Sequence, residues 1–311
     1  MTATTAREDV AVPARKTGFR TLVGNLARDP WAVAAATTIV VFVLAAILAD
    51  AITAITGVDP YTYNQHLLDG RGQPIGWGGG ISATHWFGVE PLTGRDLFAI
   101  VVYGARPSLF IGISATLLAV LIGTVVGISS GYFGGWYDRI TSRAVDVMFG
   151  FPTLVFLIAL MAIIPADLPR PPFIALVIGV FGWPGISRIV RGQTLALRER
   201  NFVVASKAMG ARSWRIVLGQ VLPNVGATIV VVASVIIPGM IAAEAALSFL
   251  GVGVTPPTPS WGRTIGEAIL WVRTSPMYLI FPGAALFLIT LAFNVFGDSL
   301  RDALDPRTAR R

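Results

Sequence analysis

Few side chains in this chain could carry out covalent or metal chemistry. It contains no cysteine and only two histidines, His66 and His85, and neither histidine belongs to an HExxH zinc motif. The two lysines, Lys16 and Lys207, do not follow a glycine, whereas a phosphate-binding loop requires Gly-Lys-Ser/Thr. We therefore expect no catalytic residue, no disulfide, no metal site, no cofactor held by this chain, and no ATP hydrolysis of the P-loop type.

One acidic residue, Glu244, interrupts an otherwise uncharged stretch. It separates the uncharged runs 216–243 and 245–262. A charge at the middle of a membrane costs roughly 2.5–3.5 kcal/mol on insertion scales, so such a residue is expected to have polar neighbours. Glu244 is interpreted either as lining a polar path or bracing an interface with a partner subunit, or as a structural carboxylate near the outer end of a membrane span.

The elements that would hold these residues are strongly apolar. Hydrophobic residues make up 54% of the chain and charged residues only 13%, about half of what a soluble chain carries. The mean hydropathy is +0.70. A membrane helix needs about 20 mostly apolar residues, and six uncharged runs approach or exceed that length: 31–49, 107–137, 147–166, 171–187, 216–243 and 274–297. The sequence thus predicts an all-α integral membrane protein with about six transmembrane helices.

Positive charges orient these spans. If the N-terminus lies inside, most of the 24 Lys and Arg residues fall in inner segments. The outer segments then hold Arg71, Arg95, Arg170, Arg263 and Arg273, with Arg106 at a boundary. Because cytoplasmic loops are enriched in Lys and Arg, this distribution predicts that both termini are cytoplasmic. It also explains the net charge of +7 without a nucleic-acid partner.

This topology divides the chain into five parts. They are a cytoplasmic N-terminal tail (1–30), a first transmembrane helix (31–53), an extracytoplasmic loop (54–98), a five-helix core (99–298) that includes a cytoplasmic loop (188–223), and a cytoplasmic tail (299–311). The extracytoplasmic loop is too long for a simple turn, and it forms either a small lobe that touches a partner or a covering loop.

Two features of the N-terminal region allow more than one interpretation. The first apolar run begins only at Trp31 and exceeds the apolar region of a typical signal peptide, so we expect an uncleaved span, although Ala49-Asp50-Ala51 resembles a cleavage site. Residues 18–29 alternate apolar and cationic side chains, and they form either a short interfacial helix or a disordered basic tail.

The cytoplasmic loop 188–223 is expected to form a helix, a break and a second helix. Asn201 is placed to cap the first helix and Ser213 the second, while Gly210 stands where a glycine would end the first helix. The apolar faces would consist of Phe202, Ala205, Met209, Trp214, Val217 and Leu218. The result is either a bent knob that a cytoplasmic partner can grip or a helical hairpin lying on the membrane face.

The same loop carries a family resemblance. Ala205-Ser206-Lys207-Ala208-Met209-Gly210, nine residues and then Gln220-Val221-Leu222-Pro223 resemble the EAA loop of ABC importer permeases. That pattern has Glu-Ala-Ala, three residues, a glycine, nine residues and a stretch ending in Leu-Pro. The chain departs from it at Val204, where the glutamate is expected, and at Ser206, where the second alanine is expected.

Three further stretches are similar to the C-type subunits of the dipeptide/oligopeptide/nickel importers. The first lies before the second span, the second follows Glu244, and the third is near the C-terminus. The first stretch consists of Phe87-Gly88, Gly94-Arg95-Asp96 and Gly104-Ala105-Arg106-Pro107-Ser108-Leu109. The second consists of Glu244-Ala245-Ala246-Leu247-Ser248-Phe249-Leu250-Gly251 and Pro256-Pro257-Thr258-Pro259-Ser260-Trp261-Gly262. The third consists of Phe281-Pro282-Gly283, Leu291-Ala292-Phe293-Asn294, Gly297-Asp298 and Leu300-Arg301-Asp302-Ala303-Leu304-Asp305-Pro306-Arg307. The resemblance, to DppC/OppC-like permeases, implies the MetI-like permease fold in a bacterial cytoplasmic (inner) membrane.

The resemblance also implies partners and a function. The expected complex contains a second, B-type permease, two cytoplasmic ABC ATPases that bind ATP and magnesium, and an extracytoplasmic substrate-binding protein, all assembled in membrane lipid. Together they would import dipeptides or oligopeptides. The residues expected to couple this chain to the ATPases are Ala205, Ser206, Lys207, Ala208, Met209, Gly210, Ala211, Arg212, Leu222 and Pro223. In this setting Glu244 would line the translocation path or meet the other permease.

Arg95 and Asp96 lie just before the second span, on the outer side. They are expected either to contact the binding protein or to pair with each other. The main alternative to an ATP-driven importer is a secondary, ion-coupled transporter, which usually carries intramembrane charges and internal repeats. The chain has one deep acid and no evident repeat, so the importer is favoured.

Overall fold

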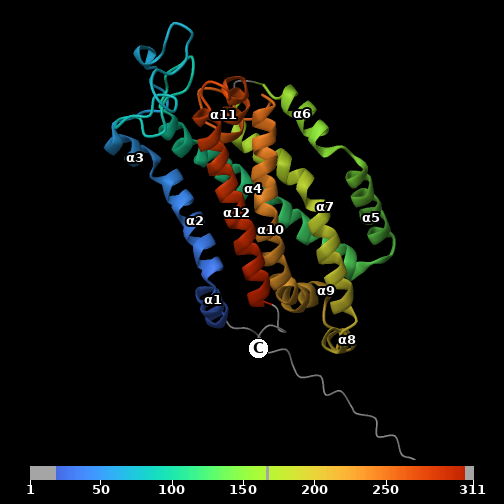
Figure 1. Cartoon of the computed structure of the whole chain (residues 1–311). Coiled ribbons are helices and arrows are strands. Elements are labelled where there is room, and N and C mark those ends of the chain that lie inside the picture. Colours follow the sequence, from blue (N-terminus) through green and yellow to red (C-terminus); the bar gives the residue numbers. More distant parts are fainter. Residues whose placement is uncertain (1–18, 166–167, 305–311) are drawn as a thin grey trace, which may run out of the picture.

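The computed structural model describes residues 19–165 and 168–304. In these residues the regular secondary structure is entirely helical, with irregular loops between the helices and no strand (Figure 1). The elements are α1 Phe19–Arg28, α2 Pro30–Ile47, α3 Ala49–Thr56, η1 Gln65–Leu67, α4 Leu97–Phe133, α5 Gly135–Gly150, α6 Thr153–Ile163, α7 Arg170–Arg198, α8 Asn201–Ala208, α9 Ser213–Ile216, the π-helical turn η2 Val217–Val221, α10 Leu222–Phe249, α11 Trp261–Ala268, η3 Ile269–Trp271 and α12 Met277–Leu304.

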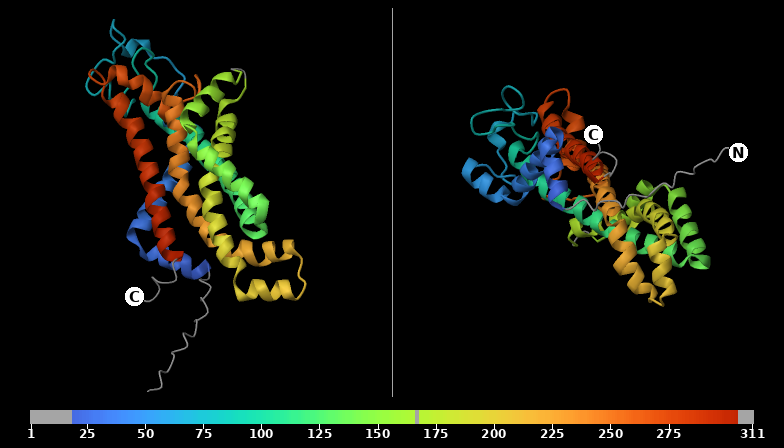
Figure 2. Two further views of the ribbon diagram at one scale, coloured as in Figure 1. Left: turned by 90° about the vertical axis from the view of Figure 1, so that its right-hand side faces the viewer. Right: turned by 90° about the horizontal axis from the view of Figure 1, so that it is seen from below.

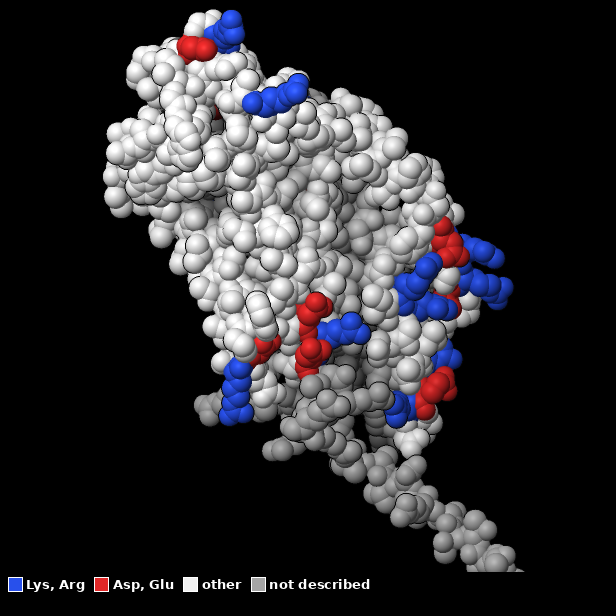
Figure 3. Space-filling model, in the orientation of Figure 1, with Lys and Arg blue, Asp and Glu red and all other residues white. Residues whose placement is uncertain are grey.

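Five helical stretches are long and apolar enough to cross a membrane: α2, α4, α7, the continuous stretch Ser213–Phe249, and α12. A sixth span results if α5 and α6, which meet at 84°, count as one broken span. The prediction of about six apolar spans is therefore confirmed: the structure has five candidate spans, or six if the bent pair counts as one. Figure 3 shows a wide uncharged band across the middle of the visible face, as expected of a surface in contact with lipid.

Several predicted boundaries are wrong. The second span begins at Leu97 rather than at Pro107, because its helix includes Arg106, whose guanidinium is accommodated by Asp50 at 2.9 Å and by the Ala46 carbonyl at 2.7 Å. The fourth span, predicted from the uncharged run 171–187, begins at Arg170, passes through Pro184 without a break and continues to Arg198. A rule that ends spans at charges and prolines misses such helices, because neighbouring groups satisfy the charge or the freed carbonyl.

The prolines within the apolar runs differ in their effect on the helices. Pro152 stands at the break between α5 and α6, whereas Pro238 lies inside α10 and Pro282 inside α12, both of which continue past their proline. At the N-terminal side, residues 19–28 form a helix, so the helical alternative for 18–29 is confirmed over this range, while Gly18 lies outside the described residues.

Helix α4 is the centre of the bundle. It contributes Val101 and Leu109 to a buried cluster with α2, α11 and α12, Ile111 to a cluster with α6 and α7, and Ile128 to a cluster with α7, α8 and α10. Its side chains thus connect the end of the molecule where α11 lies with the opposite end, where α8 and α9 lie (Figure 1).

Glycines let α4 and α7 approach each other closely. Gly123, Gly127 and Gly131 recur every four residues and so line one face of α4. A Cβ atom at Gly127 would lie 2.7 Å from the carbonyl oxygen of Ser187 and 2.8 Å from the Cβ of Val190. Small residues at such crossings are the usual means by which membrane helices bring their backbones together.

The two ends of the molecule carry different structures. The loop between α3 and α4 and the short helix α11 lie at one end, while α1, the end of α12, α8 and α9 lie at the other (Figure 2). Asp29, between α1 and α2, accepts a 2.7 Å hydrogen bond from Ser299 of α12, so the two ends of the described chain meet. We call the first end the outer end and the second the inner end.

Candidate functional site

The strongest candidate site is the inner-end hairpin formed by residues 201–221, which we call the knob. It consists of α8, α9 and η2, and it joins α7 directly to α10. In Figure 2 its two helical arms lie side by side and project from the bundle. The predicted helix, break and helix are thus present in the loop that sequence analysis selected.

Gly210 ends α8 as expected. Its φ of +78° is left-handed, and its N–H donates to the Lys207 carbonyl while the N–H of Ala211 donates to the Ser206 carbonyl, both at 3.0 Å. These two bonds form a Schellman motif, which satisfies the last carbonyls of a helix. The turn after α8 therefore depends on a glycine.

The predicted caps are wrong by one residue. Arg200 and Arg212, rather than Asn201 and Ser213, are the N-cap residues, and neither uses its side chain for the cap. Asn201 and Ser213 already have helical geometry, because the carbonyl of the preceding arginine accepts the first helical hydrogen bonds.

Buried contacts fix the inner face of the knob to the bundle. Val203, Ile216 and Val221 are buried against α4, α7 and α10. The ammonium of Lys207 lies 4.9 Å from the centre of the Tyr132 ring of α4, a cation–π contact. The knob is therefore packed as part of the inner end and does not hang free.

Ser206, which replaces an expected alanine, has a structural contact. Its hydroxyl accepts a 2.6 Å hydrogen bond from the Gln220 amide and donates to the Phe202 carbonyl. Because Gln220 belongs to the second arm, this bond joins the two arms of the knob.

Elsewhere on its surface the knob exposes large apolar side chains. The exposed fractions are 43% for Phe202, 50% for Val204, 80% for Met209, 57% for Trp214 and 56% for Leu218. Exposed aromatic and methionine side chains on a rigid element are typical of protein interfaces. Val204, at the position where a glutamate is expected, is exposed and uncharged, and it lies on another side of α8 from Phe202, two residues earlier.

Glu244 does not reach a surface in this structure. It is fully buried, and its carboxylate accepts hydrogen bonds from Ser108 at 2.7 Å, Ser248 at 2.8 Å and Ser260 at 3.2 Å. These hydroxyls belong to α4, α10 and the start of α11. The geometry corresponds to the structural alternative, and not to a side chain that faces an open path or another permease.

Arg95 and Asp96 are buried as well, which corrects both expectations for them. Arg95 donates to Glu90 through two bonds of 2.6 and 2.9 Å. Asp96 caps α4 through the Ala99 N–H at 2.7 Å and lies 2.7 Å from Nδ1 of His85. With exposed fractions of 7% and 1%, neither residue offers a docking surface, and they do not pair with each other.

The charges of this outer cluster influence one another. Burial acts to raise the pKa of Glu90, but the Arg95 guanidinium, together with hydrogen bonds from Thr93 and Tyr278, holds that pKa below its usual range. Burial raises the pKa of Asp96, against the hydrogen bonds from Ala99 and His85. Glu90 thus stays ionised beside its partner at neutral pH.

Sequence reasoning missed the residues that complete this outer cluster. The hydroxyl of Tyr278 in α12 lies 2.6 Å from Glu90 and 3.0 Å from Glu267 in α11, and Glu267 lies 3.5 Å from Arg263. The cluster therefore connects the outer loop with α11 and α12. No spacing in the sequence joins Glu90 to a tyrosine 188 positions later.

Comparison with known proteins identifies the family to which this architecture belongs. Residues 123–310 match the family model described as binding-protein-dependent transport system inner membrane component. The chain belongs to this family. The match includes the knob, Glu244 and α12, and its members are membrane permease components, not ATPases.

Individual relatives indicate the group of permeases within this family that the chain resembles. The chain is 42% identical to the glutathione transport system permease protein GsiD of Pectobacterium atrosepticum over 228 residues, which cover 73% of this chain and 74% of the relative. It is 40% identical, with the same coverage, to the dipeptide transport system permease protein DppC of Alkalihalophilus pseudofirmus and to GsiD of Escherichia coli O1:K1. These similarities fit a DppC/OppC-like permease.

Proposed function

We propose that this chain is one permease subunit of an ATP-driven importer for small peptides, such as dipeptides or glutathione. The observation that carries the proposal is the knob, which is fixed to the bundle through buried side chains and exposes large apolar side chains elsewhere on its surface. Relatives named as glutathione and dipeptide permeases support the substrate class. A second, B-type permease would complete the translocation path.

The knob is suited to transmit motion. It is continuous with α7 on one side and with α10 on the other, so a force on it acts on two spans at once. Two cytoplasmic ATPases would grip the knobs of the two permeases through the exposed apolar side chains. ATP and magnesium would be bound by those ATPases, and an extracytoplasmic protein would deliver the peptide at the outer end.

This function requires a defined orientation. The inner end, with the knob and both ends of the described chain, would lie in the cytoplasm of a bacterium, and the spans would lie in its inner membrane. Arg139, Arg143, Arg188 and Arg191 support this orientation, since cationic residues are enriched in cytoplasmic segments. A secondary, ion-coupled transporter is not favoured, because the family depends on a binding protein.

Purification of the chain from its native membrane in a mild detergent tests the proposal. We expect two ATPases and a second permease to copurify, and we expect the ATPase activity of the eluate to respond to added dipeptide or glutathione. If the chain elutes without an ATPase after chemical cross-linking of the intact membrane, the proposal is wrong. Uptake driven by an ion gradient would then be the measurement to make.

A further inference from the structure

Helix α5 is attached to the bundle through a break at each end. Gly134 and Gly135, between α4 and α5, both have left-handed φ angles, of +67° and +64°. At its other end Phe151 and Pro152 separate α5 from α6, and the two helices meet at 84°. Non-helical residues at the ends of a rigid element are the positions that absorb backbone rotation in hinge motions.

The contact between α5 and α7 is mainly electrostatic. Val145 is the one buried residue of α5. Asp138 accepts two hydrogen bonds from Arg191, at 2.5 and 2.7 Å, and Asp146 accepts one from Arg188 at 2.8 Å. Arg188 also lies 4.6 Å from the centre of the Phe149 ring of α5. Two ion pairs and one cation–π contact, rather than a packed apolar seam, therefore hold α5 against α7.

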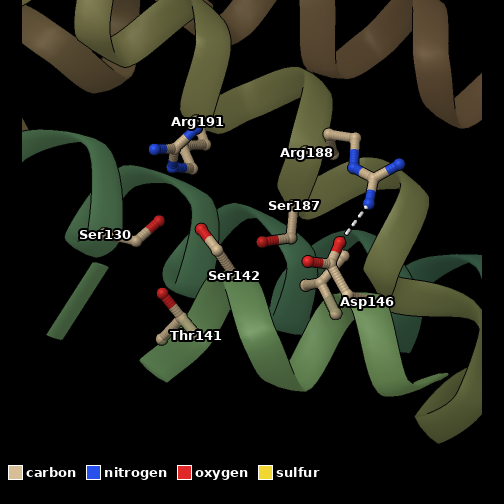
Figure 4. A pocket seen from close by; sticks show the side chains of 8 residues that line it. Ser130, Thr141, Ser142, Asp146, Ser187, Arg188 and Arg191 are labelled. Atoms are coloured by element: carbon tan, nitrogen blue, oxygen red, sulfur yellow. Dashed lines mark hydrogen bonds and ion pairs between the residues drawn. The ribbon is translucent and has the colours of Figure 1, made fainter. Parts of the chain in front are cut away.

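A polar cavity lies between these helices. It has a volume of about 50 Å³, and its hydroxyl groups come from Ser130 of α4, Thr141 and Ser142 of α5, and Ser187 of α7. In Figure 4 the hydroxyl of Ser187 points toward Ser142, and both residues line the cavity. Moving α5 away from α7 would expose these hydroxyl groups to water, and it would also uncover the buried side chain of Val145, which lines the same cavity.

The neighbouring interface has the opposite character. Helices α4 and α7 are in backbone contact along Gly123, Gly127 and Gly131, and α7 continues toward the knob. A displacement of the knob would therefore move α7 together with α4. Helix α5, at the edge of the bundle beside α7 (Figure 1), is held to α7 by the two ion pairs and by Arg188 over the Phe149 ring, and to α4 by the hydrogen bond between Ser129 and Tyr137.

We propose that α5 is a hinged strap, closed on α7 in one state of the transport cycle and swung away from it in another, with the Asp138–Arg191 and Asp146–Arg188 pairs holding the closed position. This inference rests on the proposed transport function, because the cycle that moves the strap is driven by the partner ATPases. The structure shows the closed position.

The absence of native cysteines gives a direct test. The double variant Ser142→Cys with Ser187→Cys is made in the full chain and studied in the assembled complex in membranes. A disulfide requires Cα atoms within about 7 Å, so oxidation reports the closed strap. We expect rapid cross-linking without nucleotide, slower cross-linking with a non-hydrolysable ATP analogue, and loss of transport on oxidation that a reductant restores. Each single-cysteine variant should transport normally under oxidation.

Removal of the ion pairs provides the second measurement. With Asp138→Asn and Asp146→Asn added, cross-linking without nucleotide should slow, whereas the control Glu199→Gln, an exposed acid at the end of α7, should leave it unchanged. Equal cross-linking with and without nucleotide in a complex that hydrolyses ATP, or undiminished transport by the cross-linked chain, would overturn the strap. A chain that assembles with no ATPase would instead overturn the proposed function.

Discussion

The sequence around Glu244 allows a functional role, but its contacts in the structure are those of a structural carboxylate. Replacing it with alanine would leave three buried serine hydroxyls without their acceptor, at about 1–3 kcal/mol for each group that finds no substitute. We expect Glu244→Ala to lower the thermal stability of the purified complex strongly. Glu244→Gln, which keeps the shape and one acceptor oxygen, should assemble and transport. A stable Gln variant that fails to transport would restore the pathway interpretation.

The buried charges of the outer cluster predict a large loss of stability when one partner is removed. Removing one partner of a buried ion pair costs about 3–5 kcal/mol, because the other charge stays buried. Glu90→Ala should therefore destabilise the chain far more than Arg71→Ala, which removes an exposed charge from the same loop. Thermal unfolding of the two variants in detergent measures the difference. Equal melting temperatures would show that Arg95 finds water or another acceptor.

At this scale the sequence predicted which residues are unusual but not what they contact. Arg95 and Asp96 were correctly singled out beside the second span, yet both proposed roles were wrong. Their partners, Glu90 and His85, follow no recognised motif, and Tyr278 joins the cluster only through the fold. Burial of a loop charge depends on tertiary contacts that local spacing does not encode.

Among the elements, the crossing of α4 and α7 allows a matched pair of substitutions. A methyl group at Gly127 would lie 2.7 Å from a backbone carbonyl oxygen, so Gly127→Ala must push the helices apart, and overpacking of this kind costs about 1–3 kcal/mol. Gly192 of α7 has open space around it, so Gly192→Ala should be neutral or stabilising by up to about 1 kcal/mol. Melting temperatures that move in the same direction would contradict this account.

The knob offers a second matched pair. Alanine at Gly210 must adopt a left-handed conformation that costs about 1–2 kcal/mol, whereas Gly219 has neither that conformation nor a close neighbour. We expect Gly210→Ala to lower peptide uptake while Gly219→Ala does not. Copurification of the ATPases with both variants distinguishes impaired coupling from impaired assembly. Equal uptake by the two variants would remove Gly210 from the coupling mechanism.

Apolar runs predicted the existence of the spans better than their limits. Helices α4 and α7 pass through arginines and prolines that a rule based on uncharged runs treats as ends. The bend between α5 and α6 was also not predicted, because Pro152 cannot be told in sequence from Pro238 and Pro282, around which the helices continue. The knob was predicted well because a glycine at a fixed distance from Leu-Pro is a local signal.

For the molecule as a whole, the decisive untested feature is its orientation in the membrane. The structure places the knob and the outer loop at opposite ends of the bundle (Figure 2), and the distribution of arginines predicts that the knob is cytoplasmic. Because the chain has no cysteine, single cysteines can report each side without interference. Ala83 in the outer loop and Ser213 in the knob are both exposed and suit this purpose.

We expect a membrane-impermeant maleimide to label Ala83→Cys in intact cells and to label Ser213→Cys only after the membrane is permeabilised. The physical reason is that translocating the arginine-rich inner segments across the membrane would be costly, whereas the outer loop carries few positive charges. Labelling of Ser213→Cys in intact cells would place the knob outside, beyond the reach of any cytoplasmic ATPase. The proposed coupling would then be impossible, even though every contact within the chain remained as described.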